Sequence, residues 1–235
     1  MSVAPFDLAS VSDLLRGALP QLSSDEQRLG ITLYCELTGG QPVPRERLAS
    51  VLGLPTTRVV QWLERPSLAY LVAYDDRRSI VGFGGLSVVP MHHRFVVHDR
   101  TLFTWCAWDA LFIPELIGMP ARVESKCPQS GDTIALTVAP GRIERTSHPE
   151  AVVSFLLPQA GAFGGEAAKT MASFCHYVFF FAGRDVGRHW IERHDGTFLM
   201  TLSEAFELGR RKNAALFPPE VRPPPSLPPP RACAA

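Results

Sequence analysis

The chain has 235 residues, of which 46% are hydrophobic, and its 23 basic residues balance 23 acidic ones. That length can bury one large core or two small ones, and the charge balance argues against broad electrostatic binding to nucleic acid or to a membrane. The N-terminus lacks a basic region followed by an apolar core, so we expect no secretory signal. Five widely scattered cysteines favour a reducing cytoplasm over a disulfide framework.

Residues 1–68 are predicted to form a helical, winged-helix-like domain. Three short helices are expected, each opened by a residue type common at helix starts and closed by glycine or proline. They run from about Ser24 to Gly39, from Pro44 to Gly53, and from Pro55 to just before Pro66. Three such helices resemble a DNA-binding core. The segment through Tyr70 carries six basic and seven acidic residues, a net charge of −1, so we expect it to pack on a catalytic domain rather than read DNA.

Residues 69–217 are predicted to form an α+β catalytic domain, with a mixed or antiparallel sheet and flanking helices. Residues 70–74 and 80–84 flank a charged turn and predict a β-hairpin. Further strands are predicted at 94–97, 122–124, 134–138, 152–157, 176–181 and 198–201, and helices at 104–116, 166–173 and 203–215. Residues 218–235 are rich in proline and predicted to be a disordered tail.

Two cysteines and an aspartate stand out in the second domain. Cys106 and Asp109 are three residues apart, a spacing that puts both on one face of a helix. Cys175 lies far downstream, ahead of the apolar run at 178–181. On spacing alone, a free cysteine beside tryptophans is more often a buried apolar residue. As a set, however, two thiols can hold a soft metal and a carboxyl group can deliver a proton.

The surrounding motifs resemble those of the organomercurial lyase (alkylmercury lyase) family. The first motif covers residues 100–114 and continues through 116–118 and 121–123, the second is Ser173-Phe174-Cys175, and residues 203–209 resemble the family's C-terminal helix. The similarity extends over roughly residues 29–213. The resemblance places Cys106, Asp109 and Cys175 at the positions of the family's catalytic set.

The resemblance implies mercury resistance through cleavage of a carbon–mercury bond, giving a hydrocarbon and Hg(II). Cys106 and Cys175 would displace the carrier thiol of the organomercurial and bind the mercury, which prefers thiolate ligands. Asp109, with at most a weak contact to the metal, would accept a thiol proton and deliver it to carbon. No cofactor is expected: small external thiols would support turnover, and a mercuric reductase would accept the Hg(II).

Four other positions receive separate predictions. Cys127 matches a family cysteine that the resemblance implies is structural. His176 stands where some members carry a second adjacent cysteine. We expect this difference to affect product transfer rather than cleavage. His92-His93 are adjacent in a predicted strand and should face opposite sides, so we expect solvated histidines rather than a metal pair. Cys233 in the tail is either a spectator or a thiol that shuttles mercury.

Two other classes of protein stay open from the residues. A mercury- or thiol-responsive regulator would combine the helical region with a sensor domain, although a sensor has no use for Asp109 as proton donor. A zinc- or copper-binding module would draw on Cys106, Cys127, Cys175 and His176. The sequence offers that module no CxxC or HxxxH pair, the close spacing from which structural zinc sites usually take ligands.

Overall fold

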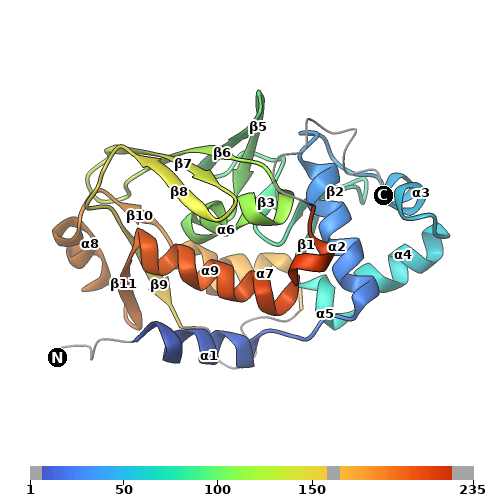
Figure 1. Cartoon of the computed structure of the whole chain (residues 1–235), viewed down its shortest axis with the longest axis horizontal. Coiled ribbons are helices and arrows are strands. Elements are labelled where there is room, and N and C mark those ends of the chain that lie inside the picture. Colours follow the sequence, from blue (N-terminus) through green and yellow to red (C-terminus); the bar gives the residue numbers. More distant parts are fainter. Residues whose placement is uncertain (1–6, 158–164, 224–235) are drawn as a thin grey trace.

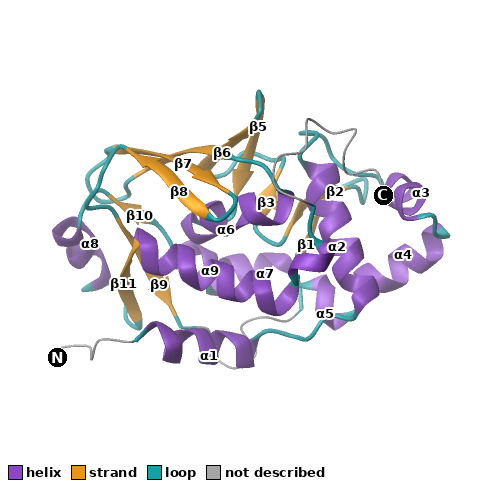
Figure 2. Cartoon of the chain, in the orientation of Figure 1, coloured by secondary structure: helices purple, strands orange, loops and turns teal. Residues whose placement is uncertain are grey.

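The computed structural model describes residues 7–157 and 165–223, which form helices around two antiparallel sheets (Figures 1 and 2). The helices are α1 (Leu8–Ala18), α2 (Ser24–Leu37), α3 (Arg45–Leu52), α4 (Thr56–Leu63), α5 (Pro66–Ala69), α6 (Ala107–Ile117), α7 (Ala167–Ser173), α8 (Arg184–Ile191) and α9 (Leu202–Leu216), with 3-10 helices η1 (Cys175–Tyr177) and η2 (Pro219–Val221). The strands are β1 (Val72–Tyr74), β2 (Ile80–Phe83), β3 (Leu86–Ser87), β4 (His93–Val97), β5 (Arg100–Thr104), β6 (Ala121–Lys126), β7 (Thr133–Ala139), β8 (Arg142–Thr146), β9 (Val152–Leu156), β10 (Phe180–Phe181) and β11 (Thr197–Thr201). The α+β prediction with antiparallel strands is confirmed.

The larger sheet has eight strands in the order β1-β2-β3-β5-β4-β6-β7-β8, and the smaller one has the order β10-β9-β11. At the centre of the larger sheet, Phe95 pairs with Leu102 on one side and with Val123 on the other. All three side chains are buried. Strand β6 alternates buried and exposed residues along its length, as expected of a strand with one face against the core.

Helix α6 is buried almost all round and packs against α2, α9 and the larger sheet. In Figure 1, α9 crosses the middle of the molecule, and it contacts α1 on one side and α6 on the other. The Trp108 indole N–H donates to the Ala205 carbonyl at 2.9 Å, and the Asn213 amide donates to the Phe112 carbonyl at 3.0 Å. These side-chain bonds fix α9 along α6.

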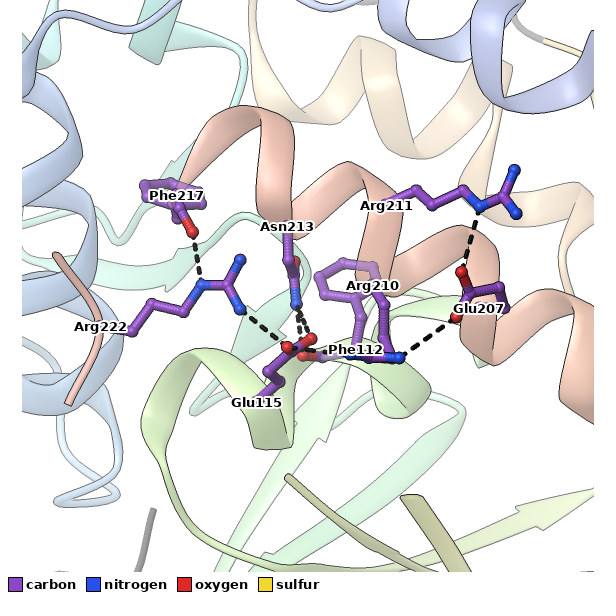
Figure 3. Close-up of polar contacts among 8 residues, drawn as sticks. All are labelled: Phe112, Glu115, Glu207, Arg210, Arg211, Asn213, Phe217 and Arg222. Atoms are coloured by element: carbon purple, nitrogen blue, oxygen red, sulfur yellow. Dashed lines mark hydrogen bonds and ion pairs between the residues drawn. The ribbon is translucent and has the colours of Figure 1, made fainter. Parts of the chain in front are cut away.

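Glu115, in the last turn of α6, joins α9 to the residues that follow it (Figure 3). Its carboxylate accepts from Asn213 at 3.1 Å and from Arg222 at 2.8 Å. Arg222 also donates to the Phe217 carbonyl. The first residues of the predicted tail are described: they include η2, and Arg222 supplies a counter-charge for Glu115. Residues 224–235, with Cys233, lie outside the described part.

The three predicted N-terminal helices are present as α2, α3 and α4. The N-cap residue of α2 is Ser23, one residue before the predicted helix start at Ser24, and Ser23 forms a capping box with Glu26. Gly53 ends α3 in the left-handed conformation at φ 69°. The winged-helix detail is not confirmed, and the predicted hairpin β1–β2 forms one edge of the eight-stranded sheet. The division into domains stays a prediction.

Two predicted elements around the cysteines are wrong in part. The helix expected from residue 104 begins at Ala107, because Thr104 still pairs with Leu86 and His93 in the sheet. The strand expected at 176–181 is the helix η1 followed by the two-residue strand β10. Among the described residues, no helix is long and apolar enough to cross a bilayer.

Candidate active site

The structure brings Cys106, Asp109 and Cys175 together. One ligand atom from each, two sulfurs and a carboxylate oxygen, lie within 4.8 Å of one another. The three residues are 0%, 6% and 5% exposed, so the cluster is shielded from solvent. Residues far apart in the sequence therefore meet in the interior, as the motifs predicted.

Cys106 and Asp109 are positioned by the start of helix α6. Cys106 is the N-cap residue, with extended backbone at φ −145° and ψ 172°. The Asp109 Oδ2 atom accepts a hydrogen bond from the Cys106 N–H at 2.9 Å. The first turn of a helix favours negative charge, because its unpaired N–H groups and the helix dipole point there. The helix start thus holds the thiol and the carboxyl side by side.

Cys175 reaches the site on η1. The Ala107 N–H, at the start of α6, donates to the Val178 carbonyl at 3.1 Å, which ties this segment to the helix that carries the other two residues. Ser154 holds the same segment from β9, since its hydroxyl donates to the Tyr177 carbonyl and accepts from the Phe179 N–H. These bonds explain why residues 175–179 leave the strand conformation.

Gly85 is a site residue that the sequence analysis missed. Its φ is +100°, and a Cβ at this position would lie 2.3 Å from Asp109 Cγ. Only glycine allows the backbone to pass this close to the carboxyl group in this conformation. The Trp105 N–H donates to the Gly85 carbonyl at 2.8 Å and fixes the approach. The pair Gly84-Gly85 after a strand was the available signal.

A cavity of about 50 Å³ adjoins Asp109 and Cys175. Its walls are mostly apolar and aromatic, and are formed by Leu19, Tyr34, Tyr70, Leu71, Gly84, Gly85, Trp105, Trp108, Phe112, Thr170, Phe174, Lys212, Leu216 and Phe217. Trp108 packs edge-to-face on Phe112 and on Phe174. The carboxyl group of Asp109 and the thiol of Cys175 therefore adjoin a largely apolar, aromatic space.

Comparisons of the sequence with known proteins relate this chain to one family. A family model described as "MerB: Alkylmercury lyase" matches residues 86–213. An alkylmercury lyase of Pseudomonas putida is 40% identical over 181 residues, which are 77% of this chain and 81% of the relative. The alkylmercury lyase of Staphylococcus epidermidis is 36% identical over 76% of this chain and 78% of its own. The chain belongs to the alkylmercury lyase family.

The fold of this lyase agrees with that assignment. The crystal structure of the mercury-bound form of MerB2 superposes with a TM-score of 0.69, covering 87% of this chain and 96% of that one at 23% identity. The match supports the same mixed α and β architecture. The alternative of a winged-helix regulator finds no support, since the curated relatives described here are lyases.

Burial controls the protonation of the site in this lyase. It raises the pKa of Asp109 to about 6, although the hydrogen bonds to Cys106 and the charge of Lys212 oppose the shift. Burial likewise raises the pKa of the Cys106 thiol well above its ordinary value. The hydrogen bond with Cys106 lowers the pKa of Cys175, but burial and the nearby Asp109 outweigh it, and that pKa is also raised. Burial therefore favours the protonated forms of the Asp109 carboxyl group and of both thiols.

The remaining predicted positions lie elsewhere. Within the described residues, the three-residue cluster includes neither Cys127 nor His176, so the four-ligand zinc or copper module is wrong. His176 is exposed, and Cys127 is buried beside the Ser130 N–H. The prediction of two solvated histidines is wrong for His93, which is buried and bonded to the Ser125 hydroxyl at 2.8 Å.

Proposed function

We propose that this lyase cleaves organomercurials by protonolysis, with Cys106 and Cys175 binding the mercury and Asp109 relaying the proton. The observation that carries the proposal is the placing of both sulfurs and a carboxylate oxygen within 4.8 Å in a buried site. Two thiolates can share one mercury there while the carboxyl group reaches the carbon bonded to it. The organomercurial enters as an adduct of a small thiol.

The first steps transfer the mercury. One of the two site thiols displaces the carrier thiol from R–Hg⁺, and the carrier leaves with the proton. The second thiol then gives its proton to the Asp109 carboxylate and joins the mercury. Both thiols have raised pKa values in the free site, so their deprotonation depends on the metal, which makes a coordinating thiol acidic.

The last step breaks the carbon–mercury bond. Protonated Asp109 donates its proton to the carbon, the bonding electron pair goes to the new C–H bond, and R–H leaves. Hg(II) remains on two thiolates and Asp109 is again a carboxylate, so atoms and charge balance. The apolar walls favour this step because burial raises the pKa of Asp109 to about 6, which makes its protonated form easier to reach than that of an exposed aspartate. External thiols then remove Hg(II), and we propose a cytoplasmic mercuric reductase as its acceptor, with no resident cofactor.

The test is release of benzene from phenylmercury in the presence of excess small thiol, measured by gas chromatography. Wild-type protein should release benzene catalytically. Asp109→Asn should bind phenylmercury stoichiometrically and release none. Cys127→Ala is the matched control, because it removes a buried thiol outside the cluster. Tight mercury binding without benzene in the wild type, or wild-type turnover in Asp109→Asn, would contradict the proton relay.

A further inference from the structure

Lys212 is a buried cation that the proposed reaction does not use. It is 9% exposed, and among the described residues that line the cavity it is the sole basic side chain. Its Nζ atom lies 3.3 Å from the centroid of the Phe112 ring and 5.9 Å from that of Trp108. Aromatic faces attract a cation but replace only part of its hydration. A buried ammonium of this kind needs an anion.

The protein supplies no close anion for Lys212 in the described part of the chain. The nearby carboxylate of Glu115 forms ion pairs with Arg222 and Arg210. Asp109 interacts with Lys212 electrostatically but not as an ion pair within 4.0 Å, and its Oδ2 atom accepts from Cys106 instead. Burial lowers the pKa of Lys212 to about 7, and the charge of Arg222 lowers it further. The nearby Asp109, Cys106 and Glu115 act in the opposite direction and raise it.

Lys212 stands where the organic group of the substrate must go. Mercury on the two thiols puts its carbon beside Asp109, and the rest of the organic group has to occupy the cavity. The ammonium lies over Phe112 of α6, the helix that begins at Cys106 and carries Asp109. Lys212 also lines the same cavity as Asp109 and Cys175, so it adjoins the space that the organic group would enter.

The same side chain also lines the approach to the site. A groove of about 460 Å³ between α1 and α9 is lined by Leu19 and Lys212, which line the site cavity as well. The cavity of about 50 Å³ is smaller than the roughly 150 Å³ that benzene fills, so an aryl group would extend beyond it. Leu19 and Lys212 line both spaces, so an aryl group that extends from the cavity into the groove would contact Lys212.

We propose that Lys212 makes this lyase select arylmercury substrates whose organic group carries a carboxylate. The aromatic walls accept the ring, and the ammonium pairs with the carboxylate at the end remote from mercury. This inference rests on the proposed function, because it needs the mercury on Cys106 and Cys175. The alternative role, in which Lys212 only balances the charge of the mercury-bound thiolates, predicts equal effects on all organomercurials.

The experiment compares kcat/KM for 4-carboxyphenylmercury with kcat/KM for its neutral methyl ester, from arene release in excess thiol. In Lys212→Met the carboxylate/ester ratio should fall roughly 10- to 100-fold, the usual worth of a buried hydrogen bond to a charged group. Lys212→Arg should keep the preference. Lys212→Gln is a second neutral variant, and Arg188→Met, which removes an exposed cation from α8, should leave the ratio unchanged.

Two results would overturn the inference while leaving the lyase intact. The kcat/KM values for both substrates could stay at the wild-type level in both neutral variants, or both could fall by the same factor, and in either case the carboxylate/ester ratio would not change. The second outcome would assign Lys212 to charge balance in the reaction. Failure of the wild type to release arene from either substrate would instead refute the proposed function, and the inference with it.

Discussion

Replacing Asp109 with asparagine should stabilise the mercury-free protein while abolishing turnover. Burial raises the pKa of Asp109 from 3.8 to about 6. A carboxyl group with a raised folded-state pKa contributes stability that is fully present below pH 3.8 and is lost as the pH rises through about 6. Two pKa units correspond to about 3 kcal/mol. Asparagine avoids this loss, because it carries no charge at any pH.

The gain in unfolding free energy of Asp109→Asn over the wild type should not exceed about 3 kcal/mol. The pKa of about 6 already includes the opposing effects of the Cys106 hydrogen bonds and of the Lys212 charge. Asparagine offers the Cys106 N–H only an uncharged and weaker acceptor, which lowers the gain. We therefore expect Asp109→Asn to match the wild type near pH 4 and to exceed it by about 1–3 kcal/mol above pH 7. Urea unfolding of the mercury-free protein, followed at both pH values, measures the difference.

A gain that does not change with pH would show that asparagine acts through packing rather than through charge. A loss of stability above pH 7 would refute the reasoning altogether, because it would mean that the carboxylate is stabilising in this site. The double variant Asp109→Asn, Lys212→Met is the control for the coupled charge. Its stability should not change with pH through either position, because neither asparagine nor methionine titrates.

Four further variants test the site and its support. Cys106→Ala or Cys175→Ala should each abolish hydrocarbon release, because one thiolate cannot place mercury against Asp109; residual turnover above a few per cent would contradict the two-thiol site. Gly85→Ala should reduce turnover and cost about 2–4 kcal/mol in urea unfolding, since its Cβ would overlap the Asp109 carboxyl group at 2.3 Å. Arg222→Ala should cost about 1–3 kcal/mol by removing a partner of half-buried Glu115, and an unchanged unfolding midpoint would refute that role.

Local signals in the sequence predicted much of the fold. Glycine and proline punctuation predicted α3, which follows Pro44 and ends at Gly53. The strand predicted at 122–124 is the middle of β6, whose one face is buried. Strand β8 was missed because it is polar and mostly exposed, so it lacks an apolar pattern. Helix α8 is short and carries four charged or histidine residues among its eight, which gave too few apolar positions to detect.

In the site, too, residues close in sequence were predicted and residues brought together only by the fold were missed. Cys106 and Asp109 are neighbours on one helix, and the family motifs added Cys175, so the sequence predicted the trio. Gly85 and Lys212 could not be predicted this way. Their roles depend on the approach of a loop and of helix α9 to α6, and these contacts join residues distant in sequence. The η1 conformation likewise depends on Ser154 of a different strand.

The depth of the site also bears on which metals it accepts. Zinc in structural sites takes four ligands, whereas this cluster offers two thiols and one carboxyl group among the described residues. Burial keeps both thiols protonated in the free site, so a metal must displace their protons before it can bind. Mercury gains most from thiolate bonds and can do this with two of them. The burial that raises the pKa of Asp109, and so serves the proposed reaction, would therefore also disfavour metals that need a preformed anionic site.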